Sequence, residues 1–292
     1  MMYILENENL RVKISSLGAE LQSIRRPDTD TEYLWQGDKA YWGRRASNLF
    51  PVCGRLAGGG YTYRGKKYEL GSHGFARNKE WTVLHQKTDS LALQLTSDEE
   101  TLAGYPFPFA LEMTYTLDGD SLIVTTILHN EGTQTMPFAV GGHPGFNVPL
   151  SEGETFEDYV LEFDEACQPL AFELAENCFF TGKMKALALE EGRRLPLRHN
   201  LFDEDAIFVK DAAKGVTLRS TVGERSIHVS YPDAPYVGFW HTPKTEAPFV
   251  CIEPWTMGPS AENEWENIEE KVDMIHLEPG ETYRNSYVIT LK

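Results

Sequence analysis

Three short segments place ionisable side chains where glycine and proline are expected to bend the backbone, and these side chains suit proton-transfer chemistry. His73 lies in the segment GSHGFAR, His143 in GGHPGFN and Glu253 in IEPW. Histidine donates or accepts a proton near neutral pH, and partial burial at a strand end would make Glu253 a stronger base. Because glycine has no Cβ, we expect a ligand to approach both imidazoles closely.

Two imidazoles and one carboxylate are compatible with three kinds of chemistry. They suit general acid and base catalysis, metal binding by two histidines and one glutamate, or hydrogen bonding to a polyol without reaction. A single histidine is also more often a hydrogen-bonded structural residue than a catalyst. The three positions lie far apart along the chain, and the sequence has no local H-E-x-x-H metal motif. Spacing alone therefore leaves the alternatives open.

Other motifs point away from nucleotide and thiol chemistry. Residues 60–66 match the start of a phosphate-binding P-loop, but Lys67 stands where serine or threonine should hold Mg²⁺. A strand-like segment follows instead of a helix, so we interpret these residues as a hairpin turn. Cys53 and Cys251 lie in apolar strand contexts, which predicts buried, unreactive thiols. The absence of any C-x-x-C pair favours reduced thiols in a cytoplasmic protein.

Charge and composition exclude several classes of partner. The 292 residues carry 27 lysines and arginines against 44 aspartates and glutamates, which gives a formal net charge of −17. We therefore expect no nucleic-acid partner and no binding to an anionic membrane surface. The charge-free residues 132–151 contain glycines and prolines that argue against a membrane span, and no signal peptide is evident at the N-terminus. Without repeats or linkers, residues 1–292 are expected to form one domain.

The elements that must position these side chains are predicted to be almost entirely β-strands. Asp118-Gly119 separates two β-branched runs at residues 111–117 and 121–128, which predicts a hairpin. Short helical pieces are expected only around residues 101–103 and 263–269. Frequent turn signals between short strands predict an all-β sandwich or barrel. Further strands are expected at residues 10–24, 63–70, 206–209, 216–220, 226–231, 236–240, 249–252 and 282–291.

Several motifs in order resemble the aldose 1-epimerase (mutarotase) family, and more closely its LacX-related branch. They are NLFPVCGRL (48–56), YTYRGKKYEL (61–70), SHGFAR (72–77), GHPGFN (142–147), DAIF (205–208) and CIEPW (251–255). The resemblance extends from about residue 5 to the C-terminus. It implies a β-supersandwich of the galactose mutarotase type, a concave sugar site, and chemistry that needs no cofactor and no metal.

The resemblance also implies a role for each matching residue. His143 matches the general acid, Glu253 the general base, and His73 the first active-site histidine. Arg55 and Asp205 match residues that bind the sugar. In such a reaction the base takes the proton of the C1 hydroxyl while the acid protonates the ring oxygen, so the hemiacetal opens and closes again on the other face.

Other residues bear on which substrate is bound. Arg77 and Lys79 would suit a sugar phosphate, or are exposed loop cations. Trp240 and Phe146 would stack on a sugar face, or belong to the core. We therefore expect an aldose 1-epimerase acting on a small-molecule hexose. The alternatives are a hexose 6-phosphate 1-epimerase, a non-catalytic carbohydrate-binding or sensing protein and, more remotely, a metal-dependent lyase or isomerase.

Overall fold

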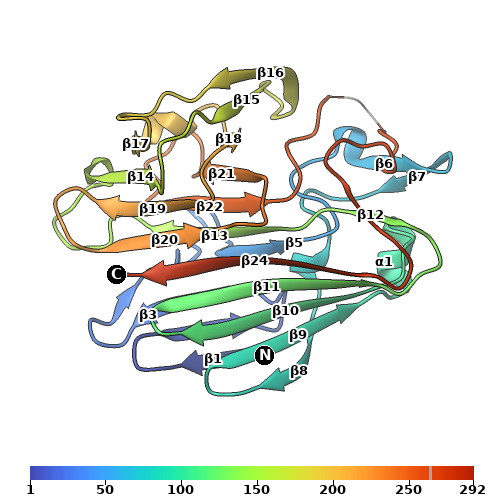
Figure 1. The fold of residues 1–292 in the computed structure, drawn as a ribbon, viewed down its shortest axis with the longest axis horizontal. Coiled ribbons are helices and arrows are strands. Elements are labelled where there is room, and N and C mark those ends of the chain that lie inside the picture. Colours follow the sequence, from blue (N-terminus) through green and yellow to red (C-terminus); the bar gives the residue numbers. More distant parts are fainter. Residues whose placement is uncertain (263–264) are drawn as a thin grey trace.

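Antiparallel strands dominate the computed structural model, which describes residues 1–262 and 265–292 (Figure 1). Among these residues the one α-helix is α1 (Glu99–Gly104), and Asp98 caps it by accepting a hydrogen bond from the Thr101 backbone N–H. The predicted all-β class is therefore confirmed. In the described part of the chain, no helix is both long enough and apolar enough to cross a bilayer.

Two large sheets form the body of the molecule, and smaller sheets cover their ends (Figure 1). In spatial order, the nine-stranded sheet contains β17 (Arg194–Pro196), β14 (Tyr159–Phe163), β19 (Gly215–Ser220), β20 (Ser226–Ser230), β24 (Thr282–Leu291), β11 (Ser121–Asn130), β10 (Phe109–Asp118), β9 (Ser90–Thr96) and β8 (Thr82–Gln86). The seven-stranded sheet contains β16 (Phe180–Ala186), β15 (Leu170–Leu174), β18 (Ile207–Lys210), β21 (Tyr236–Trp240), β22 (Phe249–Trp255), β13 (Gly141–Asn147) and β5 (Ala46–Leu49).

The remaining elements are short. A four-stranded sheet contains β1 (Met2–Glu6), β2 (Arg11–Ser15), β3 (Leu21–Arg26) and β4 (Thr31–Glu32). Two two-stranded sheets pair β12 (Met136–Phe138) with β23 (Ile275–Leu277) and β6 (Gly60–Tyr63) with β7 (Lys66–Glu69). The 3₁₀-helices are η1 (Ala57–Gly59), η2 (Ala76–Asn78), η3 (Phe156–Asp158) and η4 (His199–Phe202).

The two large sheets pack against each other through large side chains. The Asn48 side chain of β5 donates to the Tyr115 hydroxyl of β10 across 3.0 Å, and Phe163 of β14 meets Phe239 of β21 edge-on. Along β22 every residue is buried, but alternate side chains enter different clusters. Val250 and Ile252 belong to the main core, whereas Phe249 and Cys251 pack beside Trp35. This alternation sends Phe249 and Cys251 away from the main core.

The predicted hairpins are present. Asp118 pairs with Ser121 at the end of β10 and β11, and Gly119 has a φ of 56° in the turn. Arg64 and Gly65, with φ of 48° and 76°, join β6 and β7. A left-handed pair of turn residues fits a two-residue hairpin, so the rejection of a P-loop in this segment is confirmed.

Other local predictions need correction. The prediction of a helical piece at residues 263–269 is wrong for residues 265–269, which form turns and a β-bridge between Asn267 and Thr62. Residues 263–264 lie outside the described residues. The segment around His143 was expected to bend at its glycines and proline but forms the strand β13. Glu253 was expected at a strand end but lies within β22. Pairing with β5 and β22 keeps the Gly- and Pro-rich β13 extended.

Gly238 of β21 leaves room for the Phe208 ring, because the two residues are paired across β21 and β18. A Cβ at Gly238 would lie 2.5 Å from the Phe208 ring and 3.5 Å from the Glu253 Cβ. We predict that Gly238→Ala lowers the free energy of unfolding by about 1–3 kcal/mol, because the added methyl group overpacks this face.

Gly71→Ala is the matched control for this measurement. A Cβ at this exposed glycine would meet no atom within 4 Å, so its free energy of unfolding should equal that of the wild type. Denaturant unfolding of both variants makes the comparison. Equal stability of the two variants would contradict the packing role of Gly238.

Candidate active site

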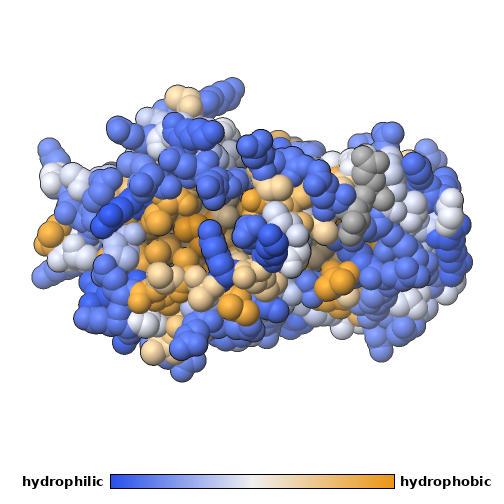
Figure 2. Space-filling model, turned by 90° about the horizontal axis from the view of Figure 1, so that it is seen from above, coloured by the Kyte–Doolittle hydropathy of each residue, from blue (hydrophilic) through white to orange (hydrophobic). Residues whose placement is uncertain are grey.

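A pocket of about 300 Å³ brings together seven of the nine site residues that the sequence analysis suggested. These residues are Arg55, His73, Arg77, His143, Asp205, Trp240 and Glu253. They come from β13, β21, β22, the 3₁₀-helix η2 and loops far apart in the sequence. Seen from above, on the side where β15 and β16 lie in Figure 1, apolar residues gather in the middle of the face between hydrophilic edges (Figure 2).

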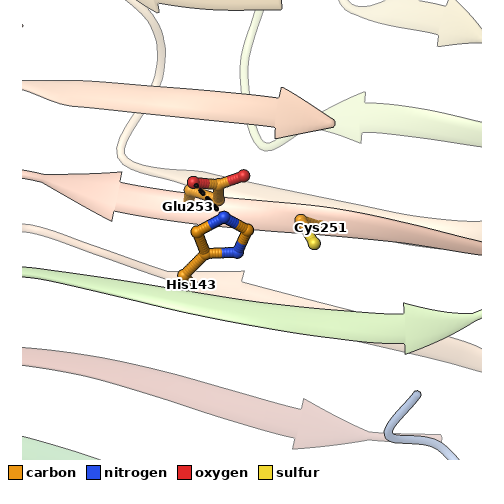
Figure 3. Close-up of side chains that lie close together, drawn as sticks. All are labelled: His143, Cys251 and Glu253. Atoms are coloured by element: carbon orange, nitrogen blue, oxygen red, sulfur yellow. Dashed lines mark ion pairs between the residues drawn. The ribbon is translucent and has the colours of Figure 1, made fainter. Parts of the chain in front are cut away.

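His143 and Glu253 form a buried pair on neighbouring strands (Figure 3). The pairing of Gly145 with Cys251 and of Gly141 with Trp255 places His143 opposite Glu253 in the antiparallel register of β13 and β22. The distance from His143 Nε2 to Glu253 Oε2 is 3.3 Å. Both side chains also line the pocket, so a ligand there can contact an imidazole and a carboxyl group at once.

Burial determines where the proton of this pair rests. It raises the pKa of Glu253 well above its ordinary value, and the nearby charge of Asp205 raises it further. Burial also lowers the pKa of His143 from 6.5 to about 3. Both shifts favour the uncharged forms, because removal from water penalises charge. Burial therefore favours a protonated Glu253 beside a neutral imidazole.

His73 is fixed by two reciprocal hydrogen bonds to Gly54. The His73 backbone N–H donates to the Gly54 carbonyl across 2.7 Å, and the Gly54 N–H donates to His73 Nδ1 across 3.1 Å. Burial lowers the pKa of His73 well below 6.5, and neighbouring His143 adds to this effect. Because Nδ1 accepts a hydrogen bond in the neutral ring, the proton is on Nε2, which is a donor.

Asp205 links the other predicted binding residues. It accepts a hydrogen bond of 2.8 Å from the Trp240 indole N–H, and its second oxygen lies 3.9 Å from Arg55 Nη1. Arg55 is half exposed, so this ion pair contributes little to stability. Its effect is to hold an acceptor and a donor together at one side of the pocket.

The sequence analysis missed one aromatic wall. Trp42 lies in the pocket and stacks on the His143 ring at a centroid distance of 4.8 Å. No motif surrounds Trp42, so nothing in the sequence distinguished it from a core residue. Phe146, which was suggested to stack on a sugar, is completely buried in the main core. Its side chain faces away from the pocket because β13 alternates sides.

Two further predictions are wrong in detail. Lys79, suggested as a phosphate ligand, contacts Asp98 at 3.3 Å and Glu100 at 2.6 Å and does not line the pocket. The glycines beside the histidines accommodate protein atoms rather than a ligand. A Cβ at Gly74 would lie 2.1 Å from the Phe50 carbonyl oxygen, and one at Gly142 would lie 2.8 Å from the Tyr287 ring.

Cysteines and metal donors were also considered from the sequence. Cys53 and Cys251 are buried free thiols whose pKa values are raised by burial, as predicted for unreactive cysteines. A metal set of two histidines and one glutamate does not form among the described residues. Among the described residues, the potential metal-donor atoms that lie within 4.8 Å of one another belong to His143, Cys251 and Glu253 (Figure 3).

Unpaired polar atoms concentrate at the pocket. Among the described residues, six buried side-chain nitrogen or oxygen atoms lack a hydrogen-bond partner. Four of them belong to the pocket residues Arg77, His143, Trp255 and Ser260. Buried polar groups are normally paired, since leaving one unpaired costs about 1–3 kcal/mol. This concentration indicates a ligand with several hydroxyl or other polar groups.

A pair of histidines, His199 and His241, lies at the end of the strand that carries Trp240. His241 is fully buried at the end of β21, and its Nδ1 donates to the Thr242 carbonyl across 2.8 Å. Its Nε2 therefore accepts from His199 Nδ1 of η4 across 3.2 Å. Burial lowers the pKa of His241 to about 4, because removal from water penalises the charged imidazolium.

The histidine pair gives a pH-dependent contribution to stability. The unfolded chain binds the proton of His241 near pH 6.5, but the folded chain binds it only near pH 4. As pH falls through this window, the free energy of unfolding of the wild type should decrease by about 1.4 kcal/mol per pH unit relative to that of His241→Asn. Denaturant unfolding at a series of pH values measures the difference. His85→Asn, at an exposed position, should follow the wild type, and equal slopes in all three proteins would exclude the effect.

Comparison with known proteins gives a family match over almost the whole chain. The family model for aldose 1-epimerase matches residues 1–290. Protein LacX (plasmid) of Lactococcus lactis subsp. lactis is 35% identical over 297 residues, which cover 98% of this chain and 98% of LacX.

Solved structures show the same architecture. A galactose mutarotase related enzyme from Lactobacillus acidophilus has a TM-score of 0.95 and 35% identity, and the match covers 100% of this chain and 97% of that one. A galactose mutarotase-like protein from Lactobacillus casei ATCC 334 has a TM-score of 0.95 and 32% identity, with 100% of both chains covered. The predicted galactose mutarotase-type fold is confirmed, and the chain belongs to the aldose 1-epimerase family.

Proposed function

We propose that this chain interconverts the α and β anomers of an aldohexose by acid–base ring opening. The observation that carries the proposal is the cross-strand pair of His143 and Glu253, 3.3 Å apart and exposed to the pocket. A protein that only binds a sugar needs hydrogen-bond partners, but it does not need a base and an acid side by side.

The pair supplies both proton transfers of the reaction. Ionised Glu253 takes the proton of the C1 hydroxyl while protonated His143 donates to the ring oxygen, and the bond between C1 and the ring oxygen breaks. After rotation about the C1–C2 bond, the hydroxyl formed from the ring oxygen attacks the aldehyde carbon on its other face. His143 then takes the proton back from that hydroxyl and Glu253 returns its proton to O1, so no net proton is consumed.

Burial and catalysis are compatible in this scheme. The form that burial favours, protonated Glu253 beside a neutral imidazole, is the form the pair reaches once the ring is open. The charged form that starts ring opening has the same total number of protons. A sugar hydroxyl donating to the carboxylate, and a ring oxygen accepting from the imidazolium, would stabilise that charged form.

The surrounding residues would hold the sugar during these steps. His73 presents its Nε2–H to the pocket, and Arg55 carries a positive charge there, so both suit oxygens that gain negative charge during ring opening. Asp205 would accept hydrogen bonds from sugar hydroxyls. Trp42 and Trp240 pack on the His143 ring, one stacked and the other edge-on, and limit its orientations.

A second candidate substrate is a hexose 6-phosphate, which Arg77 specifically favours. Arg77 lines the pocket, its Nε is buried without a partner, and the ion pairs of the described residues do not include it. Burial lowers the pKa of Arg77 to about 10, and nearby Arg44 contributes, so the side chain stays charged at neutral pH. A guanidinium that lines a pocket without a direct ion pair is suited to bind a phosphate.

The first prediction of this proposal concerns the acid and the base. Glu253→Gln and His143→Asn should each slow mutarotation about 10²–10⁴-fold, because each removes one proton-transfer group. Polarimetry of freshly dissolved α-glucose and α-galactose measures the rate. Glu246→Gln and His85→Asn, at exposed positions, are the matched controls. Near-wild-type rates in either pocket variant would refute these roles, and sugar binding without turnover in the wild type would support a sensor.

The second prediction distinguishes the free sugar from its phosphate. If the phosphorylated sugar is the substrate, Arg77→Gln should lower kcat/KM for glucose 6-phosphate about ten- to a hundredfold more than for glucose, since a hydrogen bond to a charged group contributes about 1.5–3 kcal/mol. Lys79→Gln is the control, because Asp98 and Glu100 already engage Lys79. An equal loss on both sugars would assign Arg77 to the hexose ring and dismiss the phosphate.

A further inference from the structure

Three different metal-ligating side chains lie together on two adjacent strands, and two of them, His143 and Glu253, line the pocket. One atom each from His143, Cys251 and Glu253 lies within 4.8 Å of the other two, and all three residues are buried. Cys251 and Glu253 are two residues apart on β22 and share a face, while His143 faces Glu253 from β13. Figure 3 shows the three side chains gathered between these strands.

One ring nitrogen of His143 has no other partner. Nε2 faces Glu253, whereas Nδ1 is buried without a hydrogen bond, although the side chain is only 9% exposed. In Figure 3 this second nitrogen lies on the side of the ring that is nearer Cys251. The orphaned nitrogen is an observation separate from the clustering, and it shows that the imidazole retains a free donor position for a ligand.

Charge balance favours a divalent ion at this place. The thiolate of Cys251 and the carboxylate of Glu253 would together carry two negative charges, which a buried site does not tolerate without compensation. A divalent cation cancels both, and the neutral imidazole adds no charge. Aromatic and apolar side chains around Cys251, including Trp35 and Phe249, exclude water from this region. The low polarity strengthens the electrostatic attraction between the cation and its negatively charged ligands.

The donor types select the ion. A nitrogen, a sulfur and one oxygen are typical of zinc, which binds cysteine, histidine and carboxylate in four-coordinate sites. Magnesium and calcium require sets of oxygen donors and are disfavoured. Because His143 and Glu253 also line the pocket, the fourth position would be open to water or to a sugar hydroxyl.

We propose that His143, Cys251 and Glu253 form a Zn²⁺-binding site in which the ion inhibits the acid–base pair. The inhibitory part rests on the proposed function; the binding part does not. On binding, the Cys251 thiol and the Glu253 carboxyl group release their protons to solvent. The ion would then bind a carboxylate oxygen of Glu253 and a ring nitrogen of His143, so the carboxylate would no longer be free to take a proton and the imidazole could not be protonated.

The binding test uses the full chain and Zn²⁺ alone. Isothermal titration calorimetry should show one ion per chain, and Cys251→Ser and Cys251→Ala should each raise the dissociation constant at least tenfold. Cys167→Ser, which alters a cysteine outside the pocket, should bind as the wild type does. Co²⁺ provides a second readout, since the thiolate-to-cobalt charge-transfer absorption should appear in the wild type and disappear in Cys251→Ala.

These measurements separate failure of the site from failure of the proposed function. Stoichiometric Zn²⁺ binding with no mutarotation on any sugar would support the site and overturn only the enzymatic proposal. Absence of stoichiometric binding, or unchanged affinity and cobalt absorption in Cys251→Ala, would overturn the site. If the chain is a mutarotase, Zn²⁺ should inhibit it and EDTA should restore the rate, whereas Cys251→Ala should keep its basal rate and require at least tenfold more Zn²⁺ for inhibition.

Discussion

The register between β13 and β22 is the constraint on which the rest of this structure depends. It places His143 opposite Glu253 and brings their side chains to 3.3 Å on the pocket side of the sheet. A shift of one residue in either strand would turn one of these side chains toward the main core. The pairing of β13 with β5 on one edge and β22 on the other fixes this register. The chemistry of the pocket is thus set by sheet geometry.

Burial shifts the pKa values of the His143–Glu253 pair and also makes the pair energetically costly. A carboxyl group and an imidazole removed from water both prefer their neutral forms, as the shifted pKa values of Glu253 and His143 indicate. The sheet tolerates them because the pair can share one proton without net charge. The same pocket leaves several polar atoms unpaired, and a polyhydroxylated ligand is the kind of molecule that would pair them.

Strand alternation also explains why a buried thiol lies beside the proposed base. Cys251 and Glu253 share one face of β22, while Val250 and Ile252 enter the main core. A fully apolar strand would have supplied only packing on both faces. Here one face combines a thiol, a carboxyl group and the neighbouring imidazole, so the residues proposed for proton transfer also constitute a set of zinc donors.

The pattern of residues by itself determined the all-β class, the hairpins at Asp118-Gly119 and Arg64-Gly65, and the types of side chain that carry the chemistry. The family resemblance supplied His143 and Glu253 as a pair, although the spacing of these residues left several chemistries open. Sequence patterns act over a few residues, so they located short strands well but interpreted the Gly-rich β13 as a bend. They could not show that partner strands would hold it extended.

Only the tertiary structure decided what these side chains meet. It brought Trp42 onto the His143 ring, turned Phe146 into the core, engaged Lys79 with two acidic residues and left Arg77 facing the pocket. It also placed Cys251 within reach of the catalytic candidates. The reason is physical: burial, pKa and contact depend on strands that are distant in sequence and adjacent in space, and no local pattern encodes that adjacency.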